Sequence, residues 1–426
     1  PYMFFSAALL TSVLAVARTA IGALADAMSN HHVPPLIGIF ALSTLFFGLP
    51  CFFLAAVSPL VYKVRLQTDS RVGVTVGRLA ASGVVGSIAG TYATGFWLIP
   101  AFGTRAILLG VPLVLAALGA YCLFASPARR AVTAAVLILV PWFVGTALPV
   151  DAGAPCDVES AYYCIRVVVS DKDKETGPVK KLRLDYLTHS GYRLNDPGHL
   201  WYEYEQVVAW IVKARGDISP RTLFLGGGGY MLPHWVEREF PKAAIDVIEV
   251  DPAVTRVAKA EFVPQMQRVN SLNMDARAAL RQMPEKQRYD IIFGDVFNDL
   301  SVPYHLTTVE FARLVKSRLD AAGLYIVNVV DKTNGGPLVR SMAATLKQVF
   351  PYVYALPGTD GTTARGPQLL VASAKPVEWT EWEEHYARPK FDVSRFEVPP
   401  GALVLTDDYV PTDHLLLPVF SDRWAK

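Results

Sequence analysis

Four consecutive glycines, in the stretch LFLGGGGYMLPHW at 223–235, follow a short apolar run and precede a helical pattern. A glycine turn between a strand and a helix lets main-chain N–H groups approach a ligand closely. Glu249 ends the next apolar segment, AIDVIEVDP, where a carboxylate can accept both hydroxyl hydrogens of a ribose. The turn and this acid together predict a site for a nucleoside-type ligand.

Two further acids stand at the ends of later apolar segments. Asp275, in NMDARAAL, stands at the start of a helical pattern. Its carboxylate could accept a hydrogen bond from an adenine amino group or simply cap the helix. Asp295, in YDIIFGDVFND, stands at the mouth of the next strand. Because all these features follow successive strands, we expect them to meet in one crevice.

An alternation of apolar and amphipathic segments must position these residues. We expect strands near 222–226, 245–250, 290–294 and 323–330, and helices near 230–240, 252–261, 307–319 and 336–349. This order predicts an α/β doubly wound domain with ligand at the carboxyl ends of its parallel strands. The charged turn DKDKETGPVKK predicts a β-hairpin before it, and ALVL predicts a last strand near the end.

The front of the chain has the composition of a membrane protein. Charged residues make up 18% of the 426 residues, against about 25% in a soluble domain, and the mean hydropathy is +0.29. Charge-free runs at 33–62, 79–104, 106–127 and 131–150, and the run 1–25 broken by Arg18, are each close to the roughly 20 residues of a membrane span. A cleaved signal peptide would explain only one of them.

The sequence therefore predicts three regions. Residues 1–150 form an α-helical membrane domain of about five spans, residues 151–200 a β-hairpin and substrate-entrance region, and residues 201–426 the nucleoside-binding α/β domain. Because the chain begins with Pro1 rather than Met, the sequence leaves room for further spans before it.

As a set, these stretches resemble the spermidine synthase (polyamine aminopropyltransferase) family, a class I methyltransferase-like, S-adenosylmethionine-binding fold. The resemblance rests on YYCIRVVV, LWYEYEQVVAWI, the glycine turn, VIEVDP and YDIIFGDVF, between about Tyr162 and Val330. The stretch GRLAASGVVGSIAGTYATGFWLIPAFGTR and the late VLTDDYVPTDHLLLP are similar to the membrane-fused branch of that family.

The resemblance implies a role for each matching residue. It places Gly226, Gly227 and Gly228 around the donor, Glu249 on its ribose and Asp275 at its adenine. The donor would be S-adenosylmethionine or its decarboxylated form, with no metal. The resemblance makes Asp295 and Asp299 the catalytic residues. The amine substrate would be bound by the side chains of Tyr202, Glu205, Asn298 and Tyr304.

Two departures from the family pattern affect the expected reaction. Gly229 replaces an acid that faces the donor's aminopropyl tail in the family, and Asn298 replaces the second Asp of the catalytic loop. Asn cannot take a proton from an incoming amine, so Asp295 or the shifted Asp299 must do so. The donor half of the site is retained, and the acceptor half is altered.

Three hypotheses about function follow. The first is a membrane-bound aminopropyltransferase that uses a polyamine. The second is another reaction at the sulfonium, by a lyase, a cyclase or a methyltransferase. The third is a non-catalytic membrane-complex subunit or ligand sensor. Expected partners are the lipid bilayer, the small-molecule donor and a polyamine, with a homo-oligomer or membrane complex as a further expectation and no nucleic acid.

Basic residues predict which side of the membrane the α/β domain occupies. Lys63, Arg65, Arg71, Arg78, Arg129 and Arg130 fall on one set of loops, whereas Arg105 stands nearly alone on the other. The positive-inside rule then places the α/β domain on the extracytoplasmic side of a bacterial inner membrane. This conflicts with the expected donor, because S-adenosylmethionine is a cytoplasmic metabolite.

Cysteine and histidine add little to the functional prediction. Cys156 and Cys164 could form a disulfide in an oxidising compartment, or remain as two buried thiols. The His31–His32 pair has no Cys or carboxylate at ligand spacing, so no metal site is predicted.

Overall fold

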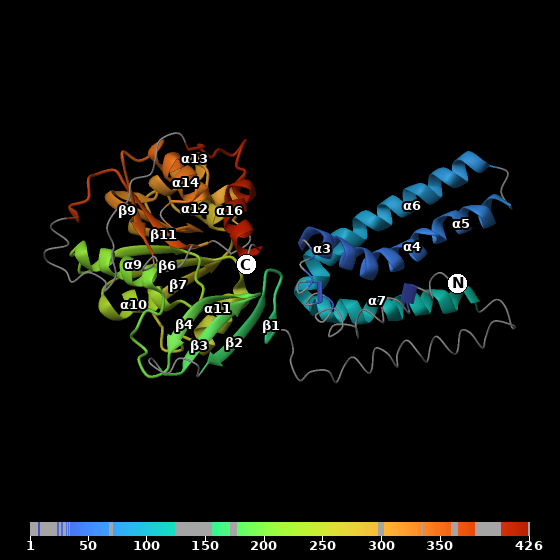
Figure 1. Cartoon of the computed structure of the whole chain (residues 1–426), viewed down its shortest axis with the longest axis horizontal. Coiled ribbons are helices and arrows are strands. Elements are labelled where there is room, and N and C mark those ends of the chain that lie inside the picture. The colour runs from blue at the N-terminus through green and yellow to red at the C-terminus, as the bar shows by residue number, and fades with distance from the viewer. Residues whose placement is uncertain are drawn as a thin grey trace. The chain divides into compact units, whose positions relative to one another are not determined.

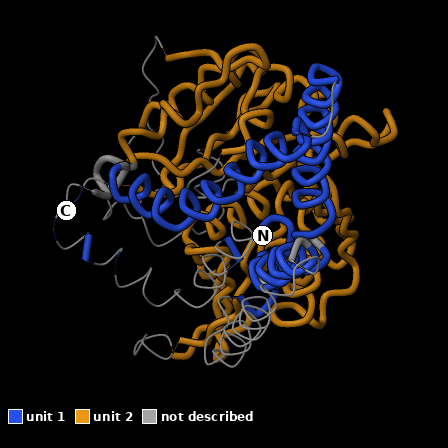
Figure 2. Tube along the Cα trace, turned by 90° about the vertical axis from the view of Figure 1, so that its right-hand side faces the viewer, with its two compact units in different colours: residues 1–162 blue, residues 163–426 orange. Residues whose placement is uncertain are grey.

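The computed structural model describes residues 35–67, 71–123, 156–170, 177–296, 302–333, 335–358, 365–379 and 402–424, with a few isolated positions before residue 35. The chain divides into two compact units, Pro1–Tyr162 and Tyr163–Lys426, which Figure 2 distinguishes by colour. The expected membrane runs at 1–25 and 131–150 lie mostly or wholly outside the described residues.

The first unit is helical in the part that the structure describes. Its elements are α3 (Pro35–Ser43), α4 (Leu49–Ala55), α5 (Val57–Leu66), α6 (Val72–Ala93) and α7 (Ile99–Leu123), with π-helical turns Thr44–Gly48 and Thr94–Leu98 and the short strand β1 (Val158–Glu159). Two helical stretches, Ile37–Leu66 and Val72–Leu98, have the length and apolar composition needed to cross a membrane. Ala106–Tyr121 is a shorter apolar helix.

The helix boundaries in this unit differ from the expected ones in two places. Arg78 lies inside α6 rather than in a loop, because the helix begins at Val72 and not at Leu79. Gly103, with φ of +75°, interrupts α7 just before the expected break at Arg105. Glycine adopts this backbone conformation at no steric cost, so the chain changes direction there.

The second unit begins with the expected hairpin. Its strands β2 (Cys164–Ser170), β3 (Val179–Leu184) and β4 (Leu187–Arg193) pair antiparallel, with one irregularity between Leu182 and Arg183. The buried apolar side chains of Ile165, Leu182 and Leu184 are spaced so that they share one face of the sheet.

A seven-stranded sheet forms the centre of this unit. Its strands are β5 (Arg221–Leu225), β6 (Ala244–Glu249), β7 (Val269–Asn273), β8 (Tyr289–Gly294), β9 (Leu319–Lys332), β10 (Tyr352–Pro357) and β11 (Arg365–Ser373). The order is β10-β11-β9-β8-β5-β6-β7, with β10 and β11 antiparallel to their neighbours and the others parallel. The chain reverses its winding direction between β5 and β8, and ligands bind at such a point in doubly wound sheets.

Helices cover both faces of this sheet. They are α9 (Glu203–Ala214), α10 (Met231–Glu239), α11 (Pro252–Glu261), α12 (Ala276–Gln282), η4 (Tyr304–Leu306), α13 (Val309–Lys316), α14 (Pro337–Lys347) and α16 (Thr412–Trp424). Figure 1 shows α12, α13 and α14 grouped on one side of the sheet and α9 and α10 on the other. The expected strands and helices of the α/β domain are therefore confirmed.

Local sequence explains where several helices begin. Asp251 caps α11 through the Ala253 N–H at 2.8 Å, and Pro252 occupies the first turn, where its missing N–H costs nothing. The Thr308 hydroxyl accepts from the Phe311 N–H at the start of α13. These caps fix the points at which the chain leaves the sheet's carboxyl edge.

The expected last strand, ALVL, is wrong. Residues 402–405 are not in a strand, and only an isolated bridge joins Thr406 to Tyr409. Leu405 is instead fully buried in the core, its N–H donates to the Thr345 hydroxyl at 2.8 Å, and its carbonyl accepts from Val309. Because this segment lies against α13 and α14 rather than at a sheet edge, its short apolar run has no strand to pair with.

Candidate functional site

The predicted residues stand at the carboxyl ends of consecutive parallel strands. Gly226 follows β5, Glu249 ends β6, Asp275 follows β7 and Asp295 follows β8. The carboxyl ends of parallel strands meet at one edge of a sheet, so these residues share that edge.

The glycine turn is held close to the neighbouring strand. Gly226 has φ of +92°, and a Cβ atom there would overlap the backbone oxygen of Asp295. Gly228 also has a positive φ, of +48°. The turn therefore needs glycine at Gly226 for two reasons, the left-handed backbone and the close approach of the chain at the end of β8.

Glu249 is tied to this turn by backbone N–H groups. Its Oε2 accepts from the Gly227 N–H at 2.8 Å, and its Oε1 accepts from the Asp251 N–H at 3.0 Å. Burial raises the pKa of Glu249, while these hydrogen bonds oppose the rise. The carboxylate has more lone pairs than these bonds use, so the acid can still accept from a ribose hydroxyl.

Asp275 caps a helix and also binds a histidine. Its Oδ1 accepts from the Ala278 N–H at 2.8 Å, and its Oδ2 lies 2.7 Å from His305 Nε2. Burial alone would raise the pKa of Asp275, but the hydrogen bonds from His305 and Ala278 hold it below its usual value. The capping role is thus observed, and contact with an adenine stays a prediction.

Asp295 is the centre of a second polar cluster. The Tyr204 hydroxyl donates to its Oδ2 at 2.8 Å, and Asn328 Nδ2 donates to its Oδ1 at 2.9 Å. Burial raises the pKa of this carboxyl, and the two hydrogen bonds only partly offset the rise. Asp295 therefore has a higher affinity for a proton than an exposed aspartate has.

Glu205 places a second acid in this cluster. It is 6% exposed, and its Oε2 accepts from the Tyr202 N–H at 3.2 Å. Burial, opposed by the Tyr202 N–H hydrogen bond and helped by the nearby Asp295, raises the pKa of Glu205 to about 8. The ring of Tyr202 stacks on that of Tyr204 with centroids 5.3 Å apart, so α9 and the residue before it bring an acid and two phenols together.

Ser190 of β4 packs directly against Gly229 of the glycine turn. The Gly229 N–H donates to the Ser190 hydroxyl at 2.8 Å, and the hydroxyl donates to the His189 carbonyl at 2.7 Å. A Cβ atom at Gly229 would lie 2.5 Å from the Ser190 Cβ atom. No side chain, and hence no acid, fits at Gly229 while Ser190 stays in place.

The remaining predicted site residues are less informative. Tyr304 is 59% exposed in η4, beside His305, with ring centroids 5.7 Å apart. Asn298 and Asp299 lie outside the described residues, so their roles stay predictions.

Three site residues were not found from the sequence. Tyr204 and Asn328 bind Asp295, and Ser190 binds the glycine turn. Asn328 did carry a signal, because it is the one amide in the apolar stretch LYIVNVV of β9. Ser190, in the stretch THSG, carried none.

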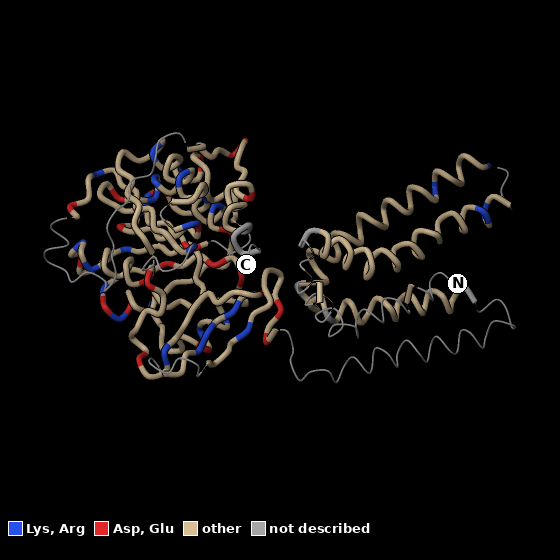
Figure 3. The backbone as a smooth tube through the Cα atoms, in the orientation of Figure 1, with Lys and Arg blue, Asp and Glu red and all other residues tan. Residues whose placement is uncertain are grey.

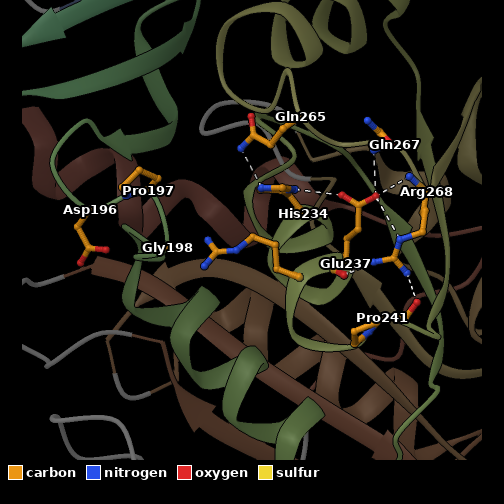
Figure 4. Close-up of a pocket in the computed structure, with 10 residues that line it drawn as sticks. Asp196, Pro197, Gly198, His234, Glu237, Pro241, Gln265, Gln267 and Arg268 are labelled. Atoms are coloured by element: carbon orange, nitrogen blue, oxygen red, sulfur yellow. Dashed lines mark hydrogen bonds and ion pairs between the residues drawn. The ribbon is translucent and has the colours of Figure 1, made fainter.

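A separate open pocket of about 820 Å³ lies along α10, and Figure 4 shows its lining residues. Glu237 accepts from the Gln267 N–H at 3.0 Å and lies 3.2 Å from His234 Nδ1. Burial alone would raise the pKa of Glu237, but backbone donation from Arg268 and Gln267 holds it below its usual value. None of the predicted site residues lines this pocket, and its buried polar groups bind one another.

The described residues contain no group of three His, Cys, Asp or Glu side chains arranged to hold a metal ion. Cys156 and Cys164 are both disulfide-bonded, which favours the first of the two alternatives left open by the sequence.

Comparison with known proteins gives two related groups. No family model matches the chain. A polyamine aminopropyltransferase from Vibrio vulnificus is 30% identical over 145 residues, covering 33% of this chain and 48% of the relative. The human eEF1A lysine and N-terminal methyltransferase is 35% identical over 149 residues, covering 32% of this chain and 21% of the relative. The chain thus spans half or less of the length of these curated relatives.

Solved structures fall into the same two groups. A probable spermidine synthase from Corynebacterium glutamicum is 24% identical, with 59% of this chain and 95% of that one covered and a TM-score of 0.48. Human methyltransferase-like protein 13 in complex with SAH is 27% identical, with 43% and 87% covered and a TM-score of 0.37. The relatives are spermidine synthases and methyltransferases. The sheet order described above is that of the class I methyltransferase-like α/β fold.

Proposed function

We propose that this protein transfers an alkyl group from an S-adenosyl sulfonium donor to a cationic amine, with aminopropyl transfer to a polyamine as the first candidate. The observation that carries the proposal is the pair of acids formed by Glu205, which is buried, and Asp295, which is partly buried. Among the described residues, neither acid makes an ion pair with a Lys or Arg side chain. Buried acids of this kind favour a ligand that brings the positive charge.

The chemistry follows from the protonation state of an amine. An alkylammonium ion has no lone pair, so it must lose a proton before its nitrogen can attack carbon. Asp295, whose pKa is raised by burial, is suited to take that proton, and Glu205 to hold the remaining positive charge. The nitrogen then bonds to the donor carbon, and the electron pair of the broken C–S bond stays on sulfur, which becomes a neutral thioether.

The donor would lie along the glycine turn. Gly226, Gly227 and Gly228 would contact its adenosine side, Glu249 the ribose hydroxyls and Asp275 the adenine amino group. The sulfonium is itself a good leaving group, so orientation of the two reactants and exclusion of water supply much of the rate enhancement. No metal is needed for this step.

Methyl transfer is the second candidate, and the contact between Gly229 and Ser190 favours it. Without an acid at Gly229, the donor's tail meets a neutral hydroxyl that is already engaged with the backbone. A tail that carries a carboxylate is not repelled there, so S-adenosylmethionine itself is acceptable as the donor. The product would then be S-adenosylhomocysteine rather than methylthioadenosine.

The thioether product identifies the reaction. The purified full chain is incubated with each donor, with and without a polyamine, and the nucleoside products are separated by chromatography. Amine-dependent methylthioadenosine supports aminopropyl transfer, and amine-dependent S-adenosylhomocysteine supports methyl transfer. Methylthioadenosine formed without an amine indicates a lyase or cyclase. If neither product forms and calorimetry detects no binding of either nucleoside, the proposal is wrong and a non-catalytic role is favoured.

We further propose that the protein is an integral membrane protein of the membrane-fused kind. The support is the length and apolar composition of Ile37–Leu66 and Val72–Leu98. Only 11% of the most apolar segment of the first stretch is buried, and none of that of the second. The disulfide-bonded state of Cys156 and Cys164 and the basic-residue asymmetry both favour an extracytoplasmic α/β domain. A membrane-impermeant thiol reagent applied to intact cells, with Cys introduced at Lys174, tests this orientation. Labelling only after lysis would place the domain in the cytoplasm.

A further inference from the structure

Four basic side chains share one face of the hairpin sheet. Arg166 of β2 lies directly opposite Arg183 of β3, and Lys181 lies opposite Val168. Arg193 of β4 belongs to the same set, opposite Val179. Because side chains alternate along a strand, this face is the reverse of the one that carries the buried Ile165, Leu182 and Leu184, although it also carries the buried Val179 at one end.

These four cations have no acidic partners in the described parts of the chain. Among the described residues, the Arg166 and Arg183 guanidinium groups donate to two backbone carbonyls, those of Asp185 at 3.4 Å and Tyr186 at 2.9 Å. The Nε atoms of Arg166 and Arg193 are buried and have no hydrogen-bond partner within the described parts of the chain. By contrast, Lys180, on the opposite face, lies 3.1 Å from Glu261 Oε2.

Like charges directly opposite one another destabilise a pair of strands. The Arg166–Arg183 pair therefore weakens the folded sheet unless an anion neutralises it. Figure 3 shows this concentration of Lys and Arg along β2 and β3.

Exposed apolar and aromatic side chains lie on this face and in the turn beside it. Val168, on the face, is 37% exposed, and Tyr186, in the turn after β3, is 80% exposed. The Lys181 ammonium lies 5.2 Å from the centre of the Trp201 ring. Basic residues beside exposed aromatic and apolar side chains are typical of surfaces that meet lipid headgroups.

We propose that this face docks on the anionic lipid headgroups of the bilayer that holds the chain's own apolar helices. The inference rests on the membrane part of the proposed function and not on the reaction. Since helices of the same chain would hold the α/β domain at the bilayer, even weak contacts with each headgroup would be occupied most of the time. Each basic residue near an anionic surface strengthens attachment roughly five-fold.

The test uses the full chain in liposomes of phosphatidylcholine, with or without added phosphatidylglycerol. Cys51 and Cys122 are replaced by Ser, Tyr186→Cys is labelled with a fluorophore, and quenching by a nitroxide on the lipid headgroup is measured. We expect stronger quenching with phosphatidylglycerol, lost at high salt because salt screens the charges. Arg166→Glu with Arg183→Glu should lower the docked-to-free ratio by at least roughly 25-fold.

Matched variants separate local from general effects. Arg256→Glu with Lys259→Glu makes the same change in net charge on α11 and should leave the quenching as in the parent. If the double Glu variant does not fold, Arg166→Gln with Arg183→Gln removes the two positive charges without adding negative ones. Thermal unfolding checks that this variant is folded, and its quenching should also fall. The inference is wrong if quenching is the same with and without phosphatidylglycerol, or if it falls equally in the α11 variant. If the chain does not incorporate into liposomes, the membrane proposal fails as well, whereas nucleoside binding in the same sample tests the reaction separately.

Discussion

The two halves of the sheet's carboxyl edge hold their acids in different ways. On the glycine side, Glu249 accepts from the backbone N–H groups of Gly227 and Asp251. On the β8 side, Asp295 accepts from the side chains of Tyr204 and Asn328. Backbone donors are placed by the strand–turn–helix unit itself, whereas side-chain donors depend on α9 and β9 being packed correctly. The acid on the donor side is therefore held by backbone groups at the ends of neighbouring strands, and the acid on the acceptor side by side chains from α9 and β9.

The largest expected effect is on the acceptor side. Asp295→Asn removes the proton acceptor, so we expect kcat to fall by roughly 10²–10⁴-fold. The affinity for methylthioadenosine, measured by calorimetry, should not change. Asp290→Asn, at the other end of β8 and paired with Arg221, is the matched control and should keep its turnover. If Asp295→Asn retains turnover within a few-fold, Asp295 is structural and Asp299 becomes the candidate.

Strand ends are easier to predict from the sequence than side-chain contacts, for a physical reason. The glycine turn, Glu249 and Asp275 each stand at or just after the end of a strand, so their positions along the chain carry the information. Tyr204, Asn328 and Ser190 reach the site from separate elements, and only the folded sheet brings them together. Asn328 could have been noticed as a polar residue in an apolar strand, but nothing in the sequence assigned it to Asp295.

A smaller effect is expected on the donor side. Glu249→Ala removes the acceptor of two ribose hydroxyl bonds, and each bond to a charged group is worth roughly 1.5–3 kcal/mol. The affinity for methylthioadenosine should therefore fall by roughly ten-fold or more. Glu261→Ala, at the end of α11, is the control. Because Glu249 also holds the glycine turn, circular dichroism must show that the variant is folded, and unchanged affinity would rule the site out.

The contact between the hairpin sheet and the glycine turn predicts a coupled pair of substitutions. Gly229→Ala should destabilise the protein by roughly 1–3 kcal/mol, because its Cβ atom would overlap that of Ser190. Ser190→Gly should relieve most of this cost, giving a coupling of roughly 0.5–3 kcal/mol in a double-mutant cycle of thermal unfolding.

Gly226→Ala provides the comparison for this cycle. Its Cβ atom would overlap the backbone oxygen of Asp295, and its φ of +92° is unfavourable for alanine. Ser190→Gly should not relieve that cost. Additive effects of Gly229→Ala and Ser190→Gly would contradict the steric explanation for the missing acid.

The first unit was predictable in composition but not in its breaks. Charge-free runs indicated apolar helices, and Ile37–Leu66 and Val72–Leu98 have the required length. Arg78 was expected to end a loop, yet one Arg does not stop a helix when the residues before it are also compatible with helix. The strand prediction for the ALVL segment failed for a related reason, because a short apolar run alone does not specify a pairing partner.

The smallest expected effect is a pH dependence on the acceptor side. Burial raises the pKa of Glu205 to about 8, so the folded protein keeps a proton that the unfolded chain loses above the ordinary glutamate value. The resulting stability is fully present below that ordinary value and is lost as pH rises through about 8. Glu205→Gln cannot titrate, so the Tm of the wild type should fall relative to this variant by roughly a few degrees between about pH 5 and 9.

Ligand binding sharpens the same comparison. A bound cation favours the ionised form of Glu205, so amine binding should release a proton and strengthen as pH approaches 8. Calorimetry of a diamine in buffers of different ionisation enthalpy measures that proton. Glu203→Gln, in the first turn of the same helix, should still release it, whereas Glu205→Gln should not. Methylthioadenosine binding should show no such proton release through Glu205, and an equal release with both ligands would mean that the two sides of the edge are not electrostatically separate.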